Sequence, residues 1–113
     1  MQPSKLQLTK QVNGEGSPAV TRLDGKLSLE TVSEFLQTMR SEGEKKLVLD
    51  MSGVSFLDSA GVGALVQLFV HRKNHGQTLA IASLTPQGNA VMQVAGLLKY
   101  IPTFPTVGDA LAA

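Results

Sequence analysis

Apolar and polar residues alternate along the first part of the chain, a pattern typical of a β-strand with one buried face. In KLQLTKQV the apolar positions are Leu6, Leu8 and Val12. The segment NGEGSP, from Asn13 to Pro18, has the composition of a turn, and AVTRLDG after it predicts a second strand. The two strands are expected to form an antiparallel hairpin.

A helical spacing follows the hairpin. Ser28 is placed to cap the start of this helix, and Gly43 can end it in the left-handed conformation. The next segment, KLVLDM, is short and almost entirely apolar, which predicts a central strand covered on both faces. The apolar positions that carry the helical spacing are Leu29, Val32, Phe35, Leu36 and Met39.

The last third of the chain continues the alternation of strands and helices. TLAIAS predicts a buried strand, and Thr85 with Pro86 begins a helix that ends at Gly96. Residues Tyr100–Phe104 predict a short strand, which neighbouring prolines restrict to a sheet edge. Thr106 is placed to cap a final short helix.

The predicted order of elements is ββαβαβαβα, which indicates an α/β fold with parallel strands wherever a helix crosses over. The chain has 113 residues, so a single domain over residues 1–113 with a mixed sheet is expected. Its hydrophobic content is 42%, as in ordinary globular proteins.

Charge and composition exclude several function classes. The net charge is +1, with ten basic residues scattered among nine acidic ones, so no nucleic-acid partner is expected. The absence of cysteine excludes disulfides and thiolate metal sites. Neither a signal peptide nor a membrane-spanning run is visible, so no membrane partner is expected. A soluble, cytoplasmic domain is predicted.

The candidate functional segment is VSFLDSAGVGALVQLF, from Val54 to Phe69. It begins as an apolar run, breaks at Asp58 and Ser59, and continues as a helix that basic residues and Gly76 bring to an end. Because the break follows a buried strand, the helix should begin near the carboxyl end of the sheet, where open α/β sheets place their ligand sites.

Glycine at positions 61 and 63 lowers the stability of the predicted helix, so its presence in the first turns needs an explanation. On a helical wheel the large apolar residues Val62, Leu65, Val66 and Phe69 should face the sheet. The opposite side carries mostly small residues, namely Ala60, Gly63, Ala64, Gln67 and His71. One hypothesis is that the side chains of this outer strip are small so that a partner can approach the helix backbone closely and dock there. The alternative is that Asp58 or Ser59 only caps the helix and the glycines relieve packing.

Enzyme and cofactor motifs are incomplete. Leu57 stands where a G-x-S-x-G nucleophile elbow needs glycine, and Val66 stands at the third glycine position of a dinucleotide loop. No Lys-Ser/Thr pair follows to make a phosphate loop. His71 and His75 are four residues apart, but no third ligand is spaced to complete a metal site. No catalytic residue, metal or cofactor is therefore expected.

The segment LVLDMSGVSFLDSAGVGALV resembles the signature of the STAS domain, in particular that of bacterial anti-sigma-factor antagonists. RLDGKL, SLTPQGNAVMQVAGLLKYI and PTVGDAL are similar to other parts of that family. The resemblance implies a non-enzymatic regulator that binds an anti-sigma factor with serine-kinase activity. It also implies that the kinase switches binding off by phosphorylating Ser59, and that a phosphoserine phosphatase reverses this.

Many members of the family carry an aspartate where this chain has Ser28. The runner-up interpretation is an unphosphorylated STAS adaptor or scaffold subunit, for example in a lipid-transport complex. The residues expected to bind the partner are Ser28, Asp58, Ser59, Ala60, Gly61, Gly63, Ala64 and Gln67.

Overall fold

A computed structural model describes residues 5–11 and 17–113. The predicted element order is confirmed, although most of the expected turn from Asn13 to Pro18, and Val12 before it, lie outside the described residues. The elements are β1 (Leu6–Gln11), β2 (Ala19–Leu27), α1 (Val32–Arg40), β3 (Lys46–Leu57), α2 (Ser59–Asn74), β4 (Thr78–Ala82), α3 (Pro86–Val94), β5 (Thr103–Phe104) and α4 (Val107–Ala112).

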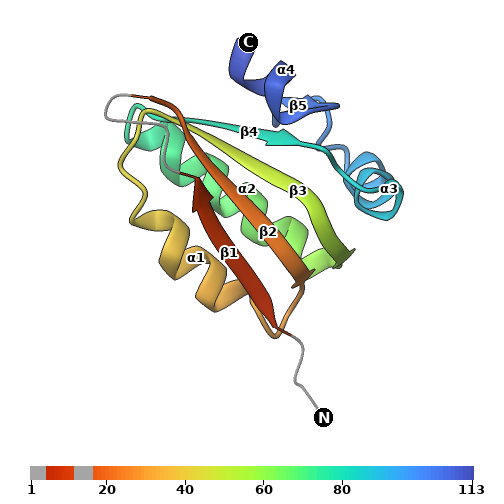
Figure 1. Ribbon diagram of the computed structural model, residues 1–113. Helices are drawn as coiled ribbons and strands as arrows, with labels where there is room; N and C mark the ends of the chain where they lie inside the picture. Colours follow the sequence, from red (N-terminus) through yellow and green to blue (C-terminus); the bar gives the residue numbers. More distant parts are fainter. Residues whose placement is uncertain (1–4, 12–16) are drawn as a thin grey trace.

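The strands form one mixed sheet in the order β1-β2-β3-β4-β5 (Figure 1). β1 and β2 are antiparallel, and every later pair is parallel because a helix connects its strands. The predicted hairpin, the central position of β3 and the edge position of β5 are confirmed, but β3 continues beyond Met51 to Leu57 and β5 contains only Thr103–Phe104.

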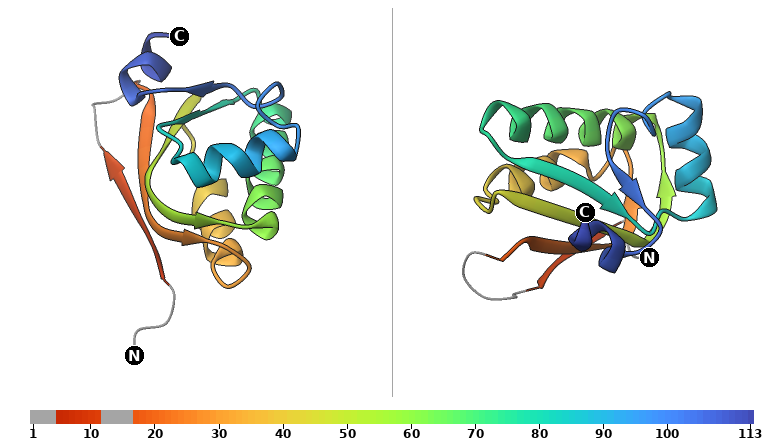
Figure 2. Two further views of the ribbon diagram at one scale, coloured as in Figure 1. Left: turned by 90° about the vertical axis from the view of Figure 1, so that its right-hand side faces the viewer. Right: turned by 90° about the horizontal axis from the view of Figure 1, so that it is seen from above.

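Helices cover the sheet unequally. α1 and α2 lie together on one face, α4 lies on the other, and α3 packs near the end of β3 (Figure 2). The larger apolar core lies beneath α1 and α2. A smaller cluster lies beneath α4 and consists of Val20, Val48, Ala80, Ala82 and Ala110.

The predicted ends of α1 are wrong, whereas those of the later helices hold. α1 begins three residues after Leu29, because the chain first makes a turn in which the Thr31 hydroxyl accepts the N–H of Ser28. It ends at Arg40, and Gly43 does not adopt the left-handed conformation. The residues predicted to delimit the later helices do so: Thr85 and Thr106 cap α3 and α4, and Gly76 and Gly96 have positive φ after α2 and α3.

The end of α2 is held by a buried arginine. In the sequence Arg72 is one of the basic residues that end this helix, yet its side chain is only 1% exposed. Its guanidinium donates to the carbonyls of Thr78 at 2.8 Å, Glu42 at 3.2 Å and Glu44 at 2.6 Å. Burial lowers the pKa of Arg72, and nearby Glu42 partly offsets this. One side chain thereby joins α2 to the loop before β3 and to the first residue of β4.

Glu42 completes this buried polar group. Its carboxylate accepts the N–H of Glu44 at 2.9 Å and lies 3.0 Å from the Lys10 ammonium. Burial alone would raise the pKa of Glu42, but these two partners and Arg72 together hold it below its ordinary value. β1, through Lys10, is thus connected to the same loop that Arg72 anchors.

Replacing Arg72 with methionine should keep most of the side-chain volume but leave three backbone carbonyls without their donor. We expect Arg72→Met to lower the free energy of unfolding by about 3 kcal/mol. Lys73→Met, one residue further along α2, should change it by less than about 0.5 kcal/mol. Urea denaturation of both variants measures the difference, and equal stabilities would contradict the anchoring role.

Candidate functional site

The candidate site lies where β3 leaves the sheet and α2 begins. β4 pairs with β3 only as far as Asp50, opposite Ala82, whereas β2 pairs with it as far as Leu57. The end of β3 therefore extends beyond β4, and the chain turns there into α2. As expected, α2 starts at the carboxyl end of the parallel strands.

Asp58 caps α2 and also holds the neighbouring loop. One carboxylate oxygen accepts the N–H of Gly61 at 2.8 Å, and the other accepts the N–H of Leu29 at 3.1 Å. The Asp58 N–H in turn donates to the carbonyl of Leu27 at 3.4 Å. The capping interpretation of Asp58 is confirmed, and the cap additionally fixes the loop that contains Ser28.

Ser59 is the first residue of α2, and its side chain is exposed. Within the described part of the chain, its hydroxyl makes no hydrogen bond to another protein group. The residue stands among backbone N–H groups of the first helical turn, which have no partner within the helix. A hydroxyl in this position is accessible to an enzyme, and an anion placed on it would meet the positive end of the helix dipole.

Ser28 lies close to this turn but is buried. Its hydroxyl donates to the Glu30 carboxylate at 2.9 Å, so it does not cap α1. The loop presents Leu29 to solvent beside Asp58 instead. The Ser28 side chain therefore organises the loop from within.

The two glycines have different roles. A β-carbon on Gly61 would clash with the carbonyl oxygen of Leu27 and lie 2.7 Å from the Leu57 side chain. Around Gly63 there is open space, so the packing of this chain does not require glycine at that position. The packing interpretation thus accounts for Gly61 and leaves Gly63 unexplained by anything inside the chain.

The helical wheel is wrong about Ala64, which is 2% exposed. α1 packs beside α2 and covers much of the side that was expected to be open. Gln67 remains exposed, although Arg40 of α1 donates to its side chain at 3.4 Å, and Ala60 is half-buried. The wheel fails because α2 is apolar on nearly every side. The residues that α2 buries are Gly61, Val62, Ala64, Leu65, Leu68 and Arg72, while Val66, Phe69 and His71 are half-buried.

Gln87 is a site residue that the sequence did not reveal. Its side-chain amide accepts the N–H of Leu57 at 3.0 Å and donates to the Leu57 carbonyl at 2.8 Å. It pairs with the end of β3 as a neighbouring strand would, on the side where β4 has ended. α3 is thereby fixed next to Ser59. A polar residue in the first turn of a helix carries no sequence signal for such a contact.

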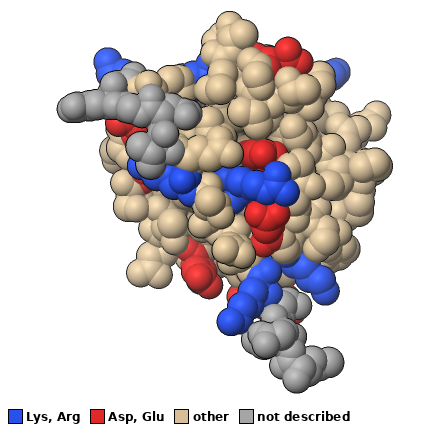
Figure 3. Space-filling view, viewed as in Figure 1, with Lys and Arg blue, Asp and Glu red and all other residues tan. Residues whose placement is uncertain are grey.

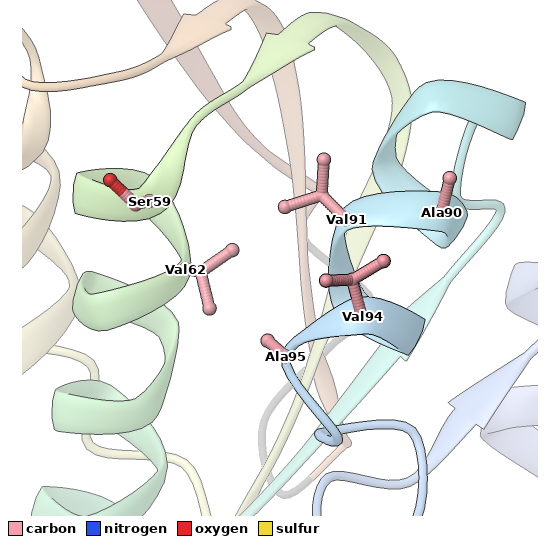
Figure 4. A pocket seen from close by; sticks show the side chains of 6 residues that line it. All are labelled: Ser59, Val62, Ala90, Val91, Val94 and Ala95. Atoms are coloured by element: carbon pink, nitrogen blue, oxygen red, sulfur yellow. The ribbon is translucent and has the colours of Figure 1, made fainter.

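A pocket of about 400 Å³ opens between α2 and α3 beside this turn. In Figure 4, Val62 points from α2 towards Val91 and Val94 of α3, and Ser59 lies at the rim with its hydroxyl turned away from α3. The walls are almost entirely apolar. The pocket therefore offers contact area for apolar groups but few hydrogen-bonding partners.

The other candidate chemistry finds little support. The rings of His71 and His75 lie 4.3 Å apart, and the described residues contain no group of three potential ligands arranged for a metal ion. Across residues 5–11 and 17–113, no helix combines the length and apolarity needed to span a bilayer.

A family model for the STAS domain matches residues 9–110. The chain is 24% identical over 97 residues to the anti-sigma F factor antagonist of Paenibacillus polymyxa, which covers 81% of this chain and 82% of that protein. It is also similar to the crystal structure of an anti-sigma factor antagonist from Mycobacterium paratuberculosis. The TM-score is 0.85 at 23% identity, over 98% of this chain and 95% of the other.

The STAS domain of a SulP transporter from Vibrio cholerae shares the same fold. Its TM-score is 0.71 at 21% identity, over 89% of this chain and 82% of that chain. At such identities the structural likenesses establish the fold alone. They also show that this fold occurs in a transporter as well as in antagonists.

The glycine pair provides a direct test of the packing at this turn. Gly61→Ala should lower the free energy of unfolding by about 1–3 kcal/mol, because the added methyl group meets backbone that cannot move away. Gly63→Ala should raise it by about 1 kcal/mol, because alanine is the better helix former and the space is open. Thermal and urea unfolding measure both, and a loss of stability in Gly63→Ala would contradict the assignment.

Gln87→Glu replaces the amide donor with a carboxylate that faces the Leu57 carbonyl. At pH 7 the variant should be less stable than the wild type by about 2 kcal/mol. The fold favours the protonated carboxyl group, so its pKa should be raised, and the deficit should shrink as the pH falls towards 4.5 and the donor returns. Gln93→Glu on the same helix, at an exposed position, is the control. A deficit of the same size at both pH values would refute the pairing role.

Proposed function

This chain belongs to the STAS domain family, and we propose that it acts as a cytoplasmic anti-sigma factor antagonist controlled by phosphorylation of Ser59. In its unphosphorylated form it binds an anti-sigma factor that is also a serine kinase, and thereby releases the sigma factor. The kinase phosphorylates Ser59 and ends the interaction, and a phosphoserine phosphatase restores it. The family predicted from the sequence is confirmed; the switch and its partners are the proposal.

The observation that carries the proposal is the position of Ser59. Its hydroxyl is exposed and unbonded within the described residues, and it directly follows the Asp58 cap at the start of α2. The hydrogen bonds around the turn also support the proposal, because Gln87 holds the main chain at Leu57 and Asp58 holds it at Gly61 and at Leu29. A kinase can reach such a hydroxyl without unfolding any of the protein.

Phosphorylation should act on the interface rather than on the fold. A phosphoserine carries a charge of about −1.5 to −2 at pH 7. At the start of α2 that charge gains from the helix dipole by about 0.3–1 kcal/mol at an exposed site. Asp58 opposes it by repulsion that solvent screens. Because these effects nearly cancel, the loss of binding must come from pressing an unpaired dianion against a partner surface that fits a hydroxyl.

The proposed contact surface around Ser59 consists of the residues that the fold leaves accessible. Ala60, Gly63 and Gln67 belong to it, and the open space at Gly63 suits the close approach of another backbone. Three other predicted contact residues shape the turn: Asp58 and Gly61 set the start of α2, and Ser28 organises the adjoining loop. Ala64 is buried and contributes through packing alone.

The second candidate function is an unphosphorylated adaptor or scaffold subunit. The similarity of the fold to the STAS domain of a SulP transporter is the observation that favours this second candidate. Purification of the tagged chain from its native host discriminates between the two functions. Capture of a protein with a kinase fold supports the antagonist, whereas capture of a transporter ATPase supports the adaptor.

Replacement of Ser59 tests the switch. We expect Ser59→Asp to weaken binding of the purified anti-sigma factor by at least about 30-fold, or 2 kcal/mol, because it mimics part of the phosphate charge at the interface. Ser59→Ala should bind within about threefold of the wild type. Isothermal titration calorimetry measures both, and circular dichroism should show an unchanged fold.

Mass spectrometry after incubation with ATP and the anti-sigma factor checks the modified residue. Phosphate should appear on Ser59 and not on the nearby Ser52 or Ser55. The Ser52 hydroxyl accepts a hydrogen bond from Arg22 at 3.2 Å on another part of the sheet. Phosphate on either of these serines with Ser59 bare, or equal affinity of the two Ser59 variants, would refute the proposal.

A further inference from the structure

Acidic residues are missing from one half of the chain. From residue 59 to residue 108, the segment that builds α2, β4, α3 and β5, the sequence contains no aspartate or glutamate. All nine acidic residues lie before or after it. The same segment holds Arg72, Lys73 and Lys99, of which Arg72 is buried and the two lysines are exposed. The surface made by this half is therefore weakly cationic and nowhere anionic.

Figure 3 shows the contrast on the face seen in Figure 1. Basic and acidic side chains lie side by side over the strands, whereas the surface over α3 carries neither. On the sheet, Arg22 pairs with Asp24 at 3.1 Å and lies 3.8 Å from Asp50. The half of the chain that includes α3 contains no acidic side chain that could pair with its lysines in this way.

An apolar groove runs through this acid-free half, beside α2. Its first part is the pocket of about 400 Å³ between α2 and α3, with Ser59 at the rim. A second hollow of about 360 Å³ lies further along α2, against the segment that follows α3. The two share the same side of α2, which supplies Ser59 and Val62 to the first, and Val66, Phe69, Val70 and Lys73 to the second. From Ser59 to Lys73 the groove follows α2 for about 21 Å.

Large apolar side chains stand exposed along its outer wall. Val94 is 90% exposed and Tyr100 is 73% exposed, and Val70 across the groove is about half-exposed. Two apolar hollows along one side of a helix, with large apolar side chains exposed beside them, are typical of an interaction site. Its length of about four helical turns and its apolar lining suit an amphipathic helix laid into a groove.

We propose that this groove binds an amphipathic helix of the anti-sigma factor, with an apolar stripe that covers Val62, Val66 and Val94. Acidic residues of that helix would lie towards Lys73 and Lys99. This inference rests on the proposed function and extends the contact surface from Ser59 along the full length of α2. It names the chemistry of the partner segment, namely apolar on one side and acidic at its end.

The charge distribution favours this occupant over the alternatives. A second copy that pairs groove to groove offers no acidic side chain from residues 59–108 to meet Lys73 and Lys99, so charge does not favour it. Two exposed lysines attract an anionic membrane by only about 1 kcal/mol each, and a concave groove does not fit a flat bilayer. An acidic helix gains from the lysines and fills the concavity.

The same arrangement connects the groove to Ser59. Residues 59–108 carry no acidic side chain, and Asp58 is the last acidic residue before them. Phosphorylation of Ser59 would add a negative charge to this half, at the rim of the groove. That charge repels an acidic partner helix, and the added phosphate also disturbs the fit of the partner surface around Ser59. A switch at one residue can therefore release a contact that extends over several turns of helix.

The test uses the full chain and the purified kinase-fold protein captured in the experiment above, with affinity measured by calorimetry. Val94→Asp and the double variant Lys73→Glu/Lys99→Glu should each weaken binding at least tenfold. Val94 is almost fully exposed, so Val94→Asp should fold normally, and circular dichroism verifies this. Raising the salt concentration should weaken the wild type more than the double variant, because the attraction is electrostatic.

Matched controls lie on other faces of the molecule. Leu111→Asp changes an exposed apolar residue of α4, and Lys5→Glu/Lys45→Glu reverses two exposed cations outside the acid-free half. Both should bind within twofold of the wild type. If the groove variants bind as the controls do while Ser59→Asp is weak, the groove proposal fails and the proposed function stands. If no kinase-fold protein is captured, the proposed function fails, and the partner assigned to the groove fails with it.

Two further measurements distinguish other occupants. Sedimentation of the free chain would reveal a dimer that Val94→Asp dissolves, which would assign the groove to a second copy. Flotation with vesicles of phosphatidylethanolamine and phosphatidylglycerol would reveal membrane binding that Val94→Asp removes. Either result overturns the proposal, and the absence of both, together with the loss of partner binding, supports it.

Discussion

The geometry around Ser59 depends on the hydrogen bonds of the Asp58 carboxylate. One oxygen completes the first turn of α2, and the other holds the backbone of Leu29 in the loop before α1. One carboxylate thus anchors the start of α2 and the loop that leads into α1. Since that anchor uses backbone donors, it constrains the main chain without covering the hydroxyl next to it. The Ser59 side chain therefore stays exposed on a main chain that hydrogen bonds hold in place.

α2 is fixed at both ends by side chains that satisfy backbone groups. Asp58 accepts N–H groups at the start, and Arg72 donates to carbonyls near the end. The negative group lies at the positive end of the helix dipole and the positive group at the negative end, so both placements stabilise the helix. Both contacts act against the loss of helix stability that the two glycines in the first turns cause. They also explain how the chain accommodates Gly63 without a packing reason of its own.

The element order, the mixed sheet and the turn at Asp58 and Ser59 could be predicted because each has a local signal. Alternation and helical spacing mark the elements, and Thr85 and Thr106 mark helix starts. The burial of Ala64 could not be predicted, because α2 is apolar on most sides and only α1 decides which side is covered. Arg72 appeared to be an ordinary cation at a helix end, and its carbonyl partners come from segments distant in sequence. Gln87 was missed for the same reason.

β3 extends beyond β4, and within the described residues the only bonds to its free side near Leu57 come from one glutamine side chain. Opening of α3 away from the sheet would break those two bonds and leave the strand ladder intact. Such a local unfolding event requires less free energy than global unfolding. The Leu57 amide proton should therefore exchange with solvent earlier than those between β2 and β3, because α3 can open beside Ser59 while that strand ladder stays paired.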